Sequence, residues 1–164
     1  MNIKCHVKRG LILLIVCIMI IQSFAIRSLL DQRDQYLYQA SAYARSYLLK
    51  LQQDISSTVV AYSMNDNERF QDCYQDLQST CYNYIAYSEF TFRFDQKLND
   101  EYSFTAQWIS KFCYTVTTQN VTIQQFDSSY FSQVLSVISN QSGESFREQL
   151  YAIQQALIAE NNTQ

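Results

Sequence analysis

The chain has 164 residues, a formal net charge of −3, no proline and two glycines. Because a sheet protein of this length needs several prolines and glycines in its tight turns, this composition disfavours a β fold and predicts an all-α protein. The acidic balance disfavours nucleic acid as a partner. Thirteen Tyr and ten Phe residues can bury enough apolar area to exclude a disordered chain.

The N-terminal end has the pattern of a membrane segment. Residues 11–26 form the apolar run LILLIVCIMIIQSFAI, and the preceding residues include Lys4, Lys8 and Arg9 but no acidic side chain. Because positively charged flanks tend to stay on the cytoplasmic side, residues 1–10 are expected to be cytoplasmic. The sequence therefore predicts a single-pass protein of the cell membrane with an extracytoplasmic C-terminal domain.

Two fates of the apolar segment are compatible with the sequence. An uncleaved signal anchor needs about 20 residues to cross the bilayer. Residues 11–30 supply that length if Arg27 extends its guanidinium to the outer interface. A cleaved signal peptide would span residues 1–25, because Ser23 and Ala25 are small residues at the two positions that signal peptidase reads. We favour the anchor, which leaves residues 31–160 as one extracytoplasmic helical domain.

Beyond the membrane segment, the apolar residues between Leu29 and Tyr62 recur at alternating steps of three and four. This heptad-like spacing predicts a long helix with a seam similar to that of a coiled coil. The seam serves either the interior of a bundle or the interface of a homodimer. Its residues are Leu37, Ala44, Leu48, Leu51 and Ile55.

Residues 64–67 interrupt this pattern, and a second helix is expected after them. The stretch at 90–94 alternates like a strand, whereas in a helix Phe90 and Phe94 would share one face. A third helix is expected to begin at a cap formed by Asn99 or Asp100. Its apolar side is predicted to carry Phe104, Trp108, Phe112 and Val116, with Tyr102 and Ile109 beside them.

Two further helices complete the expected fold. Thr122 or Asp127 is a candidate cap for a helix near residues 130–138, which would bury Phe131, Val134, Leu135 and Ile138. A loop at 139–143 precedes the last amphipathic helix, marked by Phe146, Leu150, Ile153 and Leu157. The sequence thus predicts a transmembrane helix followed by an antiparallel bundle of about four helices.

The exported part lacks the residues on which most catalytic sites depend. The single histidine, His6, precedes the membrane segment, so no imidazole is available there as a general base. The cysteines show no Cys-x2-Cys spacing, and no pair of acidic residues stands out. We therefore expect a protein without enzymatic activity or cofactor, and the sequence assigns no catalytic, cofactor-binding or metal-binding residue.

Three cysteines have more than one interpretation. Cys73 and Cys81 would lie about 12 Å apart along one helix, beyond the roughly 7 Å that a disulfide spans. Cys113 could pair with either of them if the second and third helices are neighbours. Alternatively, all three are buried small apolar residues.

Five tyrosines also have two interpretations. They form either an exposed binding face or the lining of the bundle interior with their hydroxyls at its edge. They are Tyr36, Tyr43, Tyr47, Tyr82 and Tyr87.

The order of these features resembles the N-terminal region of the YpeB-type spore germination proteins. The matching segments are Arg9–Leu13 before the anchor, Leu51–Val59 at the end of the first helix, and Trp108–Tyr114 in the third. The resemblance implies a membrane-tethered protein without catalysis of its own, which stabilises or localises a cortex-lytic enzyme in the spore. It implies the spore inner membrane as the location and carries over no catalytic residue.

These features together predict a non-catalytic extracytoplasmic helical protein that binds or positions a protein partner, in sporulation or germination if the resemblance holds. The anchor would restrict the domain to the membrane surface and so raise the effective concentration of a partner held there. The alternative hypothesis is a small-molecule sensor domain, because helical bundles outside a membrane can bind ligands between their helices. Such a sensor would have to signal through a separate membrane protein.

Overall fold

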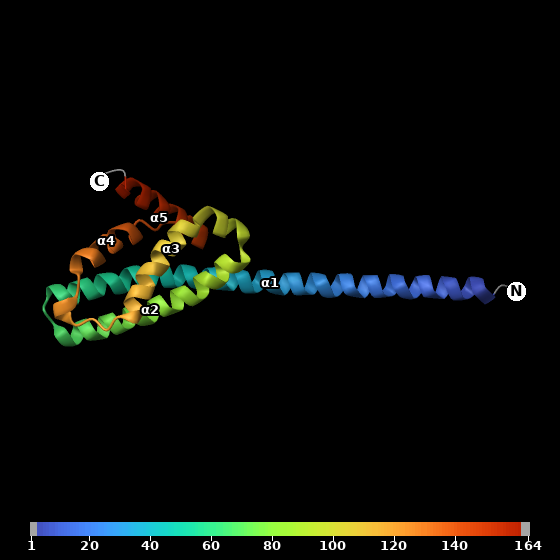
Figure 1. Ribbon diagram of the computed structural model, residues 1–164, viewed down its shortest axis with the longest axis horizontal. Helices are drawn as coiled ribbons and strands as arrows, with labels where there is room; N and C mark the ends of the chain where they lie inside the picture. Colours follow the sequence, from blue (N-terminus) through green and yellow to red (C-terminus); the bar gives the residue numbers. More distant parts are fainter. Residues whose placement is uncertain (1–2, 162–164) are drawn as a thin grey trace. The chain divides into compact units, whose positions relative to one another are not determined.

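The computed structural model describes residues 3–161, with side chains from residue 13 to residue 160. Over this range the chain is helical and contains no strand, which confirms the predicted all-α class (Figure 1). The side chains of Lys4, His6, Lys8 and Arg9 lie outside the described residues. The elements are α1 (Ile3–Ser63), α2 (Asn67–Phe94), α3 (Gln96–Thr118), the short 3-10 helix η1 (Ile123–Gln125), α4 (Ser128–Ile138) and α5 (Phe146–Asn161).

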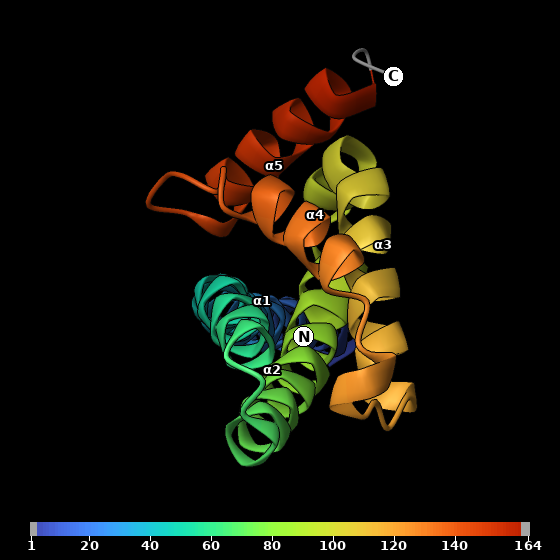
Figure 2. The ribbon, with the colours of Figure 1, turned by 90° about the vertical axis from the view of Figure 1, so that its left-hand side faces the viewer.

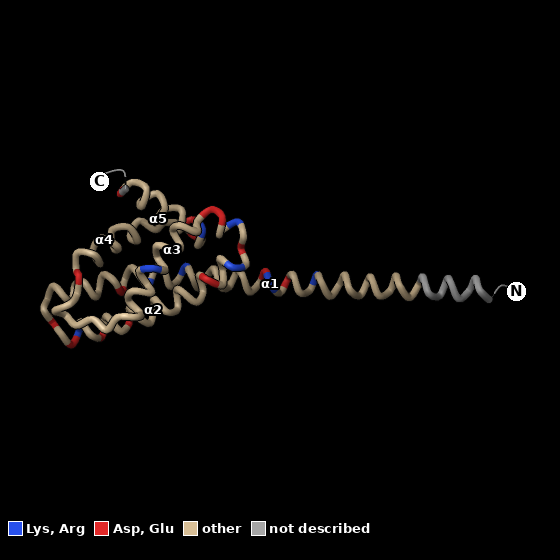
Figure 3. The backbone as a smooth tube through the Cα atoms, viewed as in Figure 1, with Lys and Arg blue, Asp and Glu red and all other residues tan. Residues whose placement is uncertain are grey.

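The chain divides into two compact units, unit 1 (Met1–Tyr38) and unit 2 (Gln39–Gln164). The described part of unit 1 is the N-terminal part of α1, whose side chains from Leu13 onward are exposed apart from the half-buried Leu37. Residues 13–26 include no charged side chain, and this part of α1 is tan in Figure 3. By length and composition, this helix is apolar enough to cross a membrane.

Unit 2 has a continuous core to which all of its helices contribute. α2 packs extensively against α3, and α5 packs on α3 and α4 (Figure 2). α4 lies near α1, because Gln141 after α4 donates one hydrogen bond to Gln52 at 2.7 Å and another to the Leu48 carbonyl. The centre is aromatic: Phe131 packs against Tyr74, Phe112, Phe126 and Tyr130.

A small polar cluster joins α1 to α2. Asp54 on α1 accepts hydrogen bonds from Lys50 at 2.7 Å and from the buried Thr80 of α2 at 2.6 Å. The ammonium of Lys50 also contacts the Thr80 hydroxyl at 3.0 Å. Because each of these groups has a partner, the cluster can be tolerated beside an apolar core.

The helix ends follow from short polar side chains that satisfy backbone N–H groups. The predicted break after α1 is confirmed: Asp66 accepts from the Arg69 N–H and caps α2. Thr122 and Asp127 were the two predicted caps of α4. Asp127 caps α4, whereas Thr122 lies at the start of η1. The predicted cap of α3 was wrong, because Asp95 accepts from the Leu98 N–H and starts the helix several residues earlier.

Two further local predictions are resolved by the fold. Residues 90–94 are the last turns of α2, so the strand-like alternation was misleading and the helical interpretation is confirmed. On α3, Tyr102, Ile109, Phe112 and Val116 are buried, but Phe104 is 62% exposed and Trp108 is half-buried. The buried face of α3 is therefore rotated toward Tyr102 and Ile109 from the predicted one.

The predicted loop after α4 is confirmed and is held by Glu148 of α5. Its carboxylate accepts from the backbone N–H groups of Glu144 at 2.7 Å and Ser145 at 3.0 Å, and these bonds hold the pKa of Glu148 below its usual value. Gly143 has a φ of +112°, and a Cβ there would lie 2.3 Å from the Glu148 Cβ. Glycine is therefore required at this turn. The predicted apolar face of α5 is buried: Phe146, Leu150, Ile153 and Leu157.

Candidate functional site

The heptad seam lies within unit 2 for four of its five residues. Ala44, Leu48, Leu51 and Ile55 are fully buried by the protein's own helices, whereas Leu37 belongs to unit 1. These four side chains therefore serve as a seam inside one chain. They are core residues and do not form an exposed surface.

None of the five tyrosines singled out in the sequence is fully buried. Tyr36, Tyr43 and Tyr82 are exposed, and Tyr47 and Tyr87 are half-buried. The ring of Tyr87 on α2 lies 4.9 Å from that of Tyr43 and 5.6 Å from that of Tyr47, both on α1. Three of the five therefore come together at the surface between these two helices.

This cluster continues along α2. Tyr87, Phe90 and Phe94 follow one another at steps of three and four, which places them on one face of the helix. The Phe90 and Phe94 rings are 4.7 Å apart, and Phe94 is 48% exposed. We call the five residues Tyr43, Tyr47, Tyr87, Phe90 and Phe94 the aromatic ridge.

The ridge has properties common in protein interfaces. Aromatic side chains provide large contact areas at a small cost in side-chain entropy, and Tyr and Phe are enriched in the cores of such interfaces. The guanidinium of Arg93 lies 6.0 Å from the centre of the Phe94 ring, and acidic and basic residues alternate in the nearby α2–α3 turn (Figure 3). The ridge thus combines exposed rings with a mixed polar edge.

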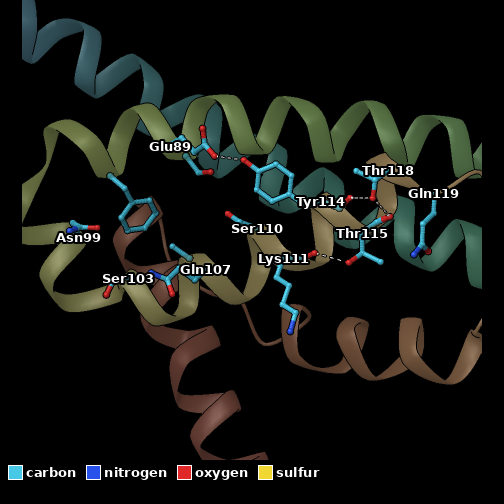
Figure 4. Close-up of a pocket in the computed structure, with 13 residues that line it drawn as sticks. Glu89, Asn99, Ser103, Gln107, Ser110, Lys111, Tyr114, Thr115, Thr118 and Gln119 are labelled. Carbon is cyan, nitrogen blue, oxygen red and sulfur yellow. Dashed lines mark hydrogen bonds between the residues drawn. The ribbon is translucent and has the colours of Figure 1, made fainter.

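A groove of about 580 Å³ lies between α2 and α3. Figure 4 shows that side chains from both helices line it, and the Tyr114 hydroxyl donates a hydrogen bond to Glu89. That bond raises the pKa of Tyr114 above its ordinary value. Most of the lining consists of neutral hydroxyl and amide groups: Ser88, Asn99, Ser103, Gln107, Ser110, Thr115, Thr118 and Gln119.

The charged groups of the groove are few. Glu89 is the only carboxylate and Lys111 the only cation among its lining residues. The lining therefore lacks the paired carboxylates that glycoside cleavage uses, but its hydroxyls and amides can hydrogen-bond a small uncharged ligand. Among side chains 13–160, no group of three or more His, Cys, Asp or Glu residues could hold a metal ion.

The three cysteines of α2 and α3 differ in burial. Cys81 and Cys113 are fully buried, whereas Cys73 is half-buried. Burial, and then the neighbouring Cys81, raise the pKa of the Cys113 thiol well above its usual value. Beside them, Tyr84 is fully buried, and burial raises the pKa of its hydroxyl.

Comparison of the chain with protein-family models, with curated proteins and with solved structures found no match. The function must therefore be inferred from the chain's own residues.

Sequence reasoning found only part of the ridge and none of the groove. It singled out Tyr43, Tyr47 and Tyr87 but treated Phe90 and Phe94 only as a question of strand or helix. The recurrence of aromatic residues at 87, 90 and 94 was a usable signal, because this spacing defines one helix face. The groove depends on how α2 packs against α3, which no local pattern encodes.

Proposed function

We propose that this protein is anchored in the cell membrane by its N-terminal helix and that unit 2, outside the cytoplasm, binds a protein partner without catalysing a reaction. The observation that carries the proposal is the aromatic ridge. Five neighbouring aromatic residues remain half-buried or exposed in a domain that buries most of its other large apolar side chains. Contiguous apolar surface of this kind marks interaction sites more often than singly exposed rings do.

The arrangement of unit 2 supports a rigid binding module. We infer an antiparallel bundle, because Tyr43 near the start of the α1 segment meets Tyr87 near the end of α2. Likewise, Glu89 late in α2 bonds Tyr114, while Gln78 bonds the carbonyl of Gln119 at the end of α3. A surface built on such packed helices keeps its side chains in place, which reduces the entropy lost on binding.

The mechanism of this protein is positional. A single anchor would confine unit 2 to one membrane face, so a partner on the same face would meet it at a raised effective concentration. The resemblance to YpeB-type proteins favours a cortex-lytic enzyme of the spore as that partner and the spore inner membrane as the site.

Membrane topology is the first test. We expect the full chain with a C-terminal tag to remain in the membrane pellet after alkaline carbonate extraction, because the apolar helix spans the bilayer. Protease added to intact spheroplasts should remove the tag, while a cytosolic control protein stays intact. The mass of the mature chain distinguishes the uncleaved anchor from cleavage after Ala25. A tag protected in intact spheroplasts, or a soluble full-length chain, would contradict the proposal.

Binding through the ridge is the second test. A photo-crosslinking amino acid at Phe94 should link to one discrete protein, whereas the same group at Tyr82, exposed on another face of α2, should not. With that partner purified, Tyr87→Ala should raise the dissociation constant about tenfold or more, because it removes a central ring of the contact. Equal crosslinking from both positions, or an unchanged dissociation constant, would exclude the ridge as the binding surface.

The groove between α2 and α3 favours a second candidate, an extracytoplasmic small-molecule sensor. Its volume and its neutral hydroxyl and amide lining suit a small polar ligand. Ser110→Phe would fill the groove without altering the ridge, so it should abolish sensing but leave partner crosslinking from Phe94 intact. A neighbouring histidine kinase gene would favour this candidate, and a neighbouring spore-lytic enzyme gene the first.

A further inference from the structure

Two buried thiols lie on neighbouring helices of unit 2. Cys81 on α2 and Cys113 on α3 are both inaccessible to solvent, and each lies three residues from one end of the bond between Gln78 and the Val116 carbonyl. Cys73 is only half-buried and lies about two turns away on α2, roughly 12 Å along the helix axis. The fold therefore selects one pair from the three cysteines of unit 2.

The register of α2 and α3 places the two cysteines at the same level of the helix pair. Contacts on both sides fix the register of the two helices: Tyr114 bonds Glu89 on one side, and Gln78 bonds the Val116 carbonyl at 3.0 Å on the other. Both cysteines are fully buried, and the two helices that carry them pack on each other. Close approach is needed because disulfide-bonded residues have Cα atoms about 4.4–6.8 Å apart.

We propose that Cys81 and Cys113 form an intramolecular disulfide that joins α2 to α3 when unit 2 folds in an oxidising compartment. In the cell, this inference rests on the proposed extracytoplasmic location of unit 2. Such compartments are where structural disulfides form and persist. The bond would close a loop of about 30 residues and restrict the unfolded chain accordingly.

The oxidant is a disulfide of the thiol–disulfide exchange class, either a protein oxidase or glutathione disulfide. One cysteine thiolate attacks the oxidant's disulfide, which gives a mixed disulfide and releases one oxidant thiolate. The second cysteine thiolate then attacks the protein sulfur of the mixed disulfide and releases the other oxidant thiolate. The two cysteines lose two protons and two electrons, and the oxidant's disulfide is reduced to two thiols.

Burial determines when this exchange occurs. In the folded domain the pKa of Cys113 is raised and its sulfur is covered, so little thiolate is available to attack. The exchange is therefore a step of folding, while α2 and α3 are assembling. Once formed, the bond is shielded from reductants by the same packing.

The test uses the full chain in detergent, unfolded with reductant and refolded with reduced and oxidised glutathione. Free thiols are then alkylated and the protein is digested with trypsin without reduction. Cys73 and Cys81 share the peptide 70–93, and Cys113 lies in the peptide 112–147. We expect mass spectrometry to show these two peptides linked, and reduction should lower the melting temperature on the order of 10 °C.

Matched variants decide which cysteines are joined. The link should persist in Cys73→Ser, where Cys81 is the only thiol left in its peptide, and disappear in Cys81→Ser. No linked peptide in the refolded wild type, or loss of the link in Cys73→Ser, overturns the proposal. The protease test in spheroplasts reports the location of unit 2 separately. A cytoplasmic unit 2 would refute the proposed function, but the refolding experiment would still show whether Cys81 and Cys113 form a disulfide.

Discussion

Replacing both Leu48 and Leu51 by Asp is expected to abolish the folding of unit 2. Both side chains are fully buried at the α1 seam. Each substitution would remove a core contact and place an unpaired carboxylate in an apolar environment, which costs several kcal/mol. Two such changes together are as large as the roughly 5–15 kcal/mol by which a domain is typically stable. Circular dichroism and thermal melting of the full chain in detergent measure the loss.

The matched control is the double variant Leu49→Asp and Val60→Asp. These residues are on the same helix but are 41% and 39% exposed, so the same chemistry should change the free energy of unfolding little. A folded, cooperatively melting Leu48→Asp and Leu51→Asp variant would show that the seam is not the core of unit 2. Equal damage from the control pair would show that the loss does not depend on burial.

Phe131→Ala is expected to lower the free energy of unfolding by about 3–5 kcal/mol, the range for deleting a buried aromatic ring. In the described part of unit 2, Phe131 has more neighbouring aromatic rings than any other residue. The centre of its ring lies 4.4 Å from that of Phe126 and 5.4 Å from that of Phe112. Its loss would leave a cavity among residues of α2, α3 and α4. Chemical denaturation monitored by Trp108 fluorescence gives the change.

Phe104→Ala provides the control for this experiment. Phe104 is 62% exposed on α3, so its removal should change stability by no more than about 0.5 kcal/mol. The comparison also tests the rotation of α3, because the sequence alone places Phe104 on the apolar side of that helix. If Phe104→Ala costs as much as Phe131→Ala, the buried face of α3 is the one predicted from the sequence.

Local patterns predicted the helices and their breaks because these depend on nearby residues. The turn at 64–67, the loop at 139–143 and the buried face of α5 follow from capping side chains and from the 3.6-residue period. The same rules failed where two local signals competed. Asp95 precedes Asn99 and Asp100 in the chain, and which of the three starts α3 depends on where α2 ends.

The sequence by itself determined that this chain is helical, that its N-terminal segment is apolar enough to cross a membrane, and that the part after this segment lacks histidine. Only the tertiary structure decided which aromatic residues remain exposed, that Cys81 and Cys113 but not Cys73 are fully buried, and that a groove lies between α2 and α3. The physical reason is the distance along the chain over which each kind of interaction acts. Helix propensity, capping and hydropathy act over a few neighbouring residues, whereas burial depends on the rotation and register of helices brought together from distant parts of the chain.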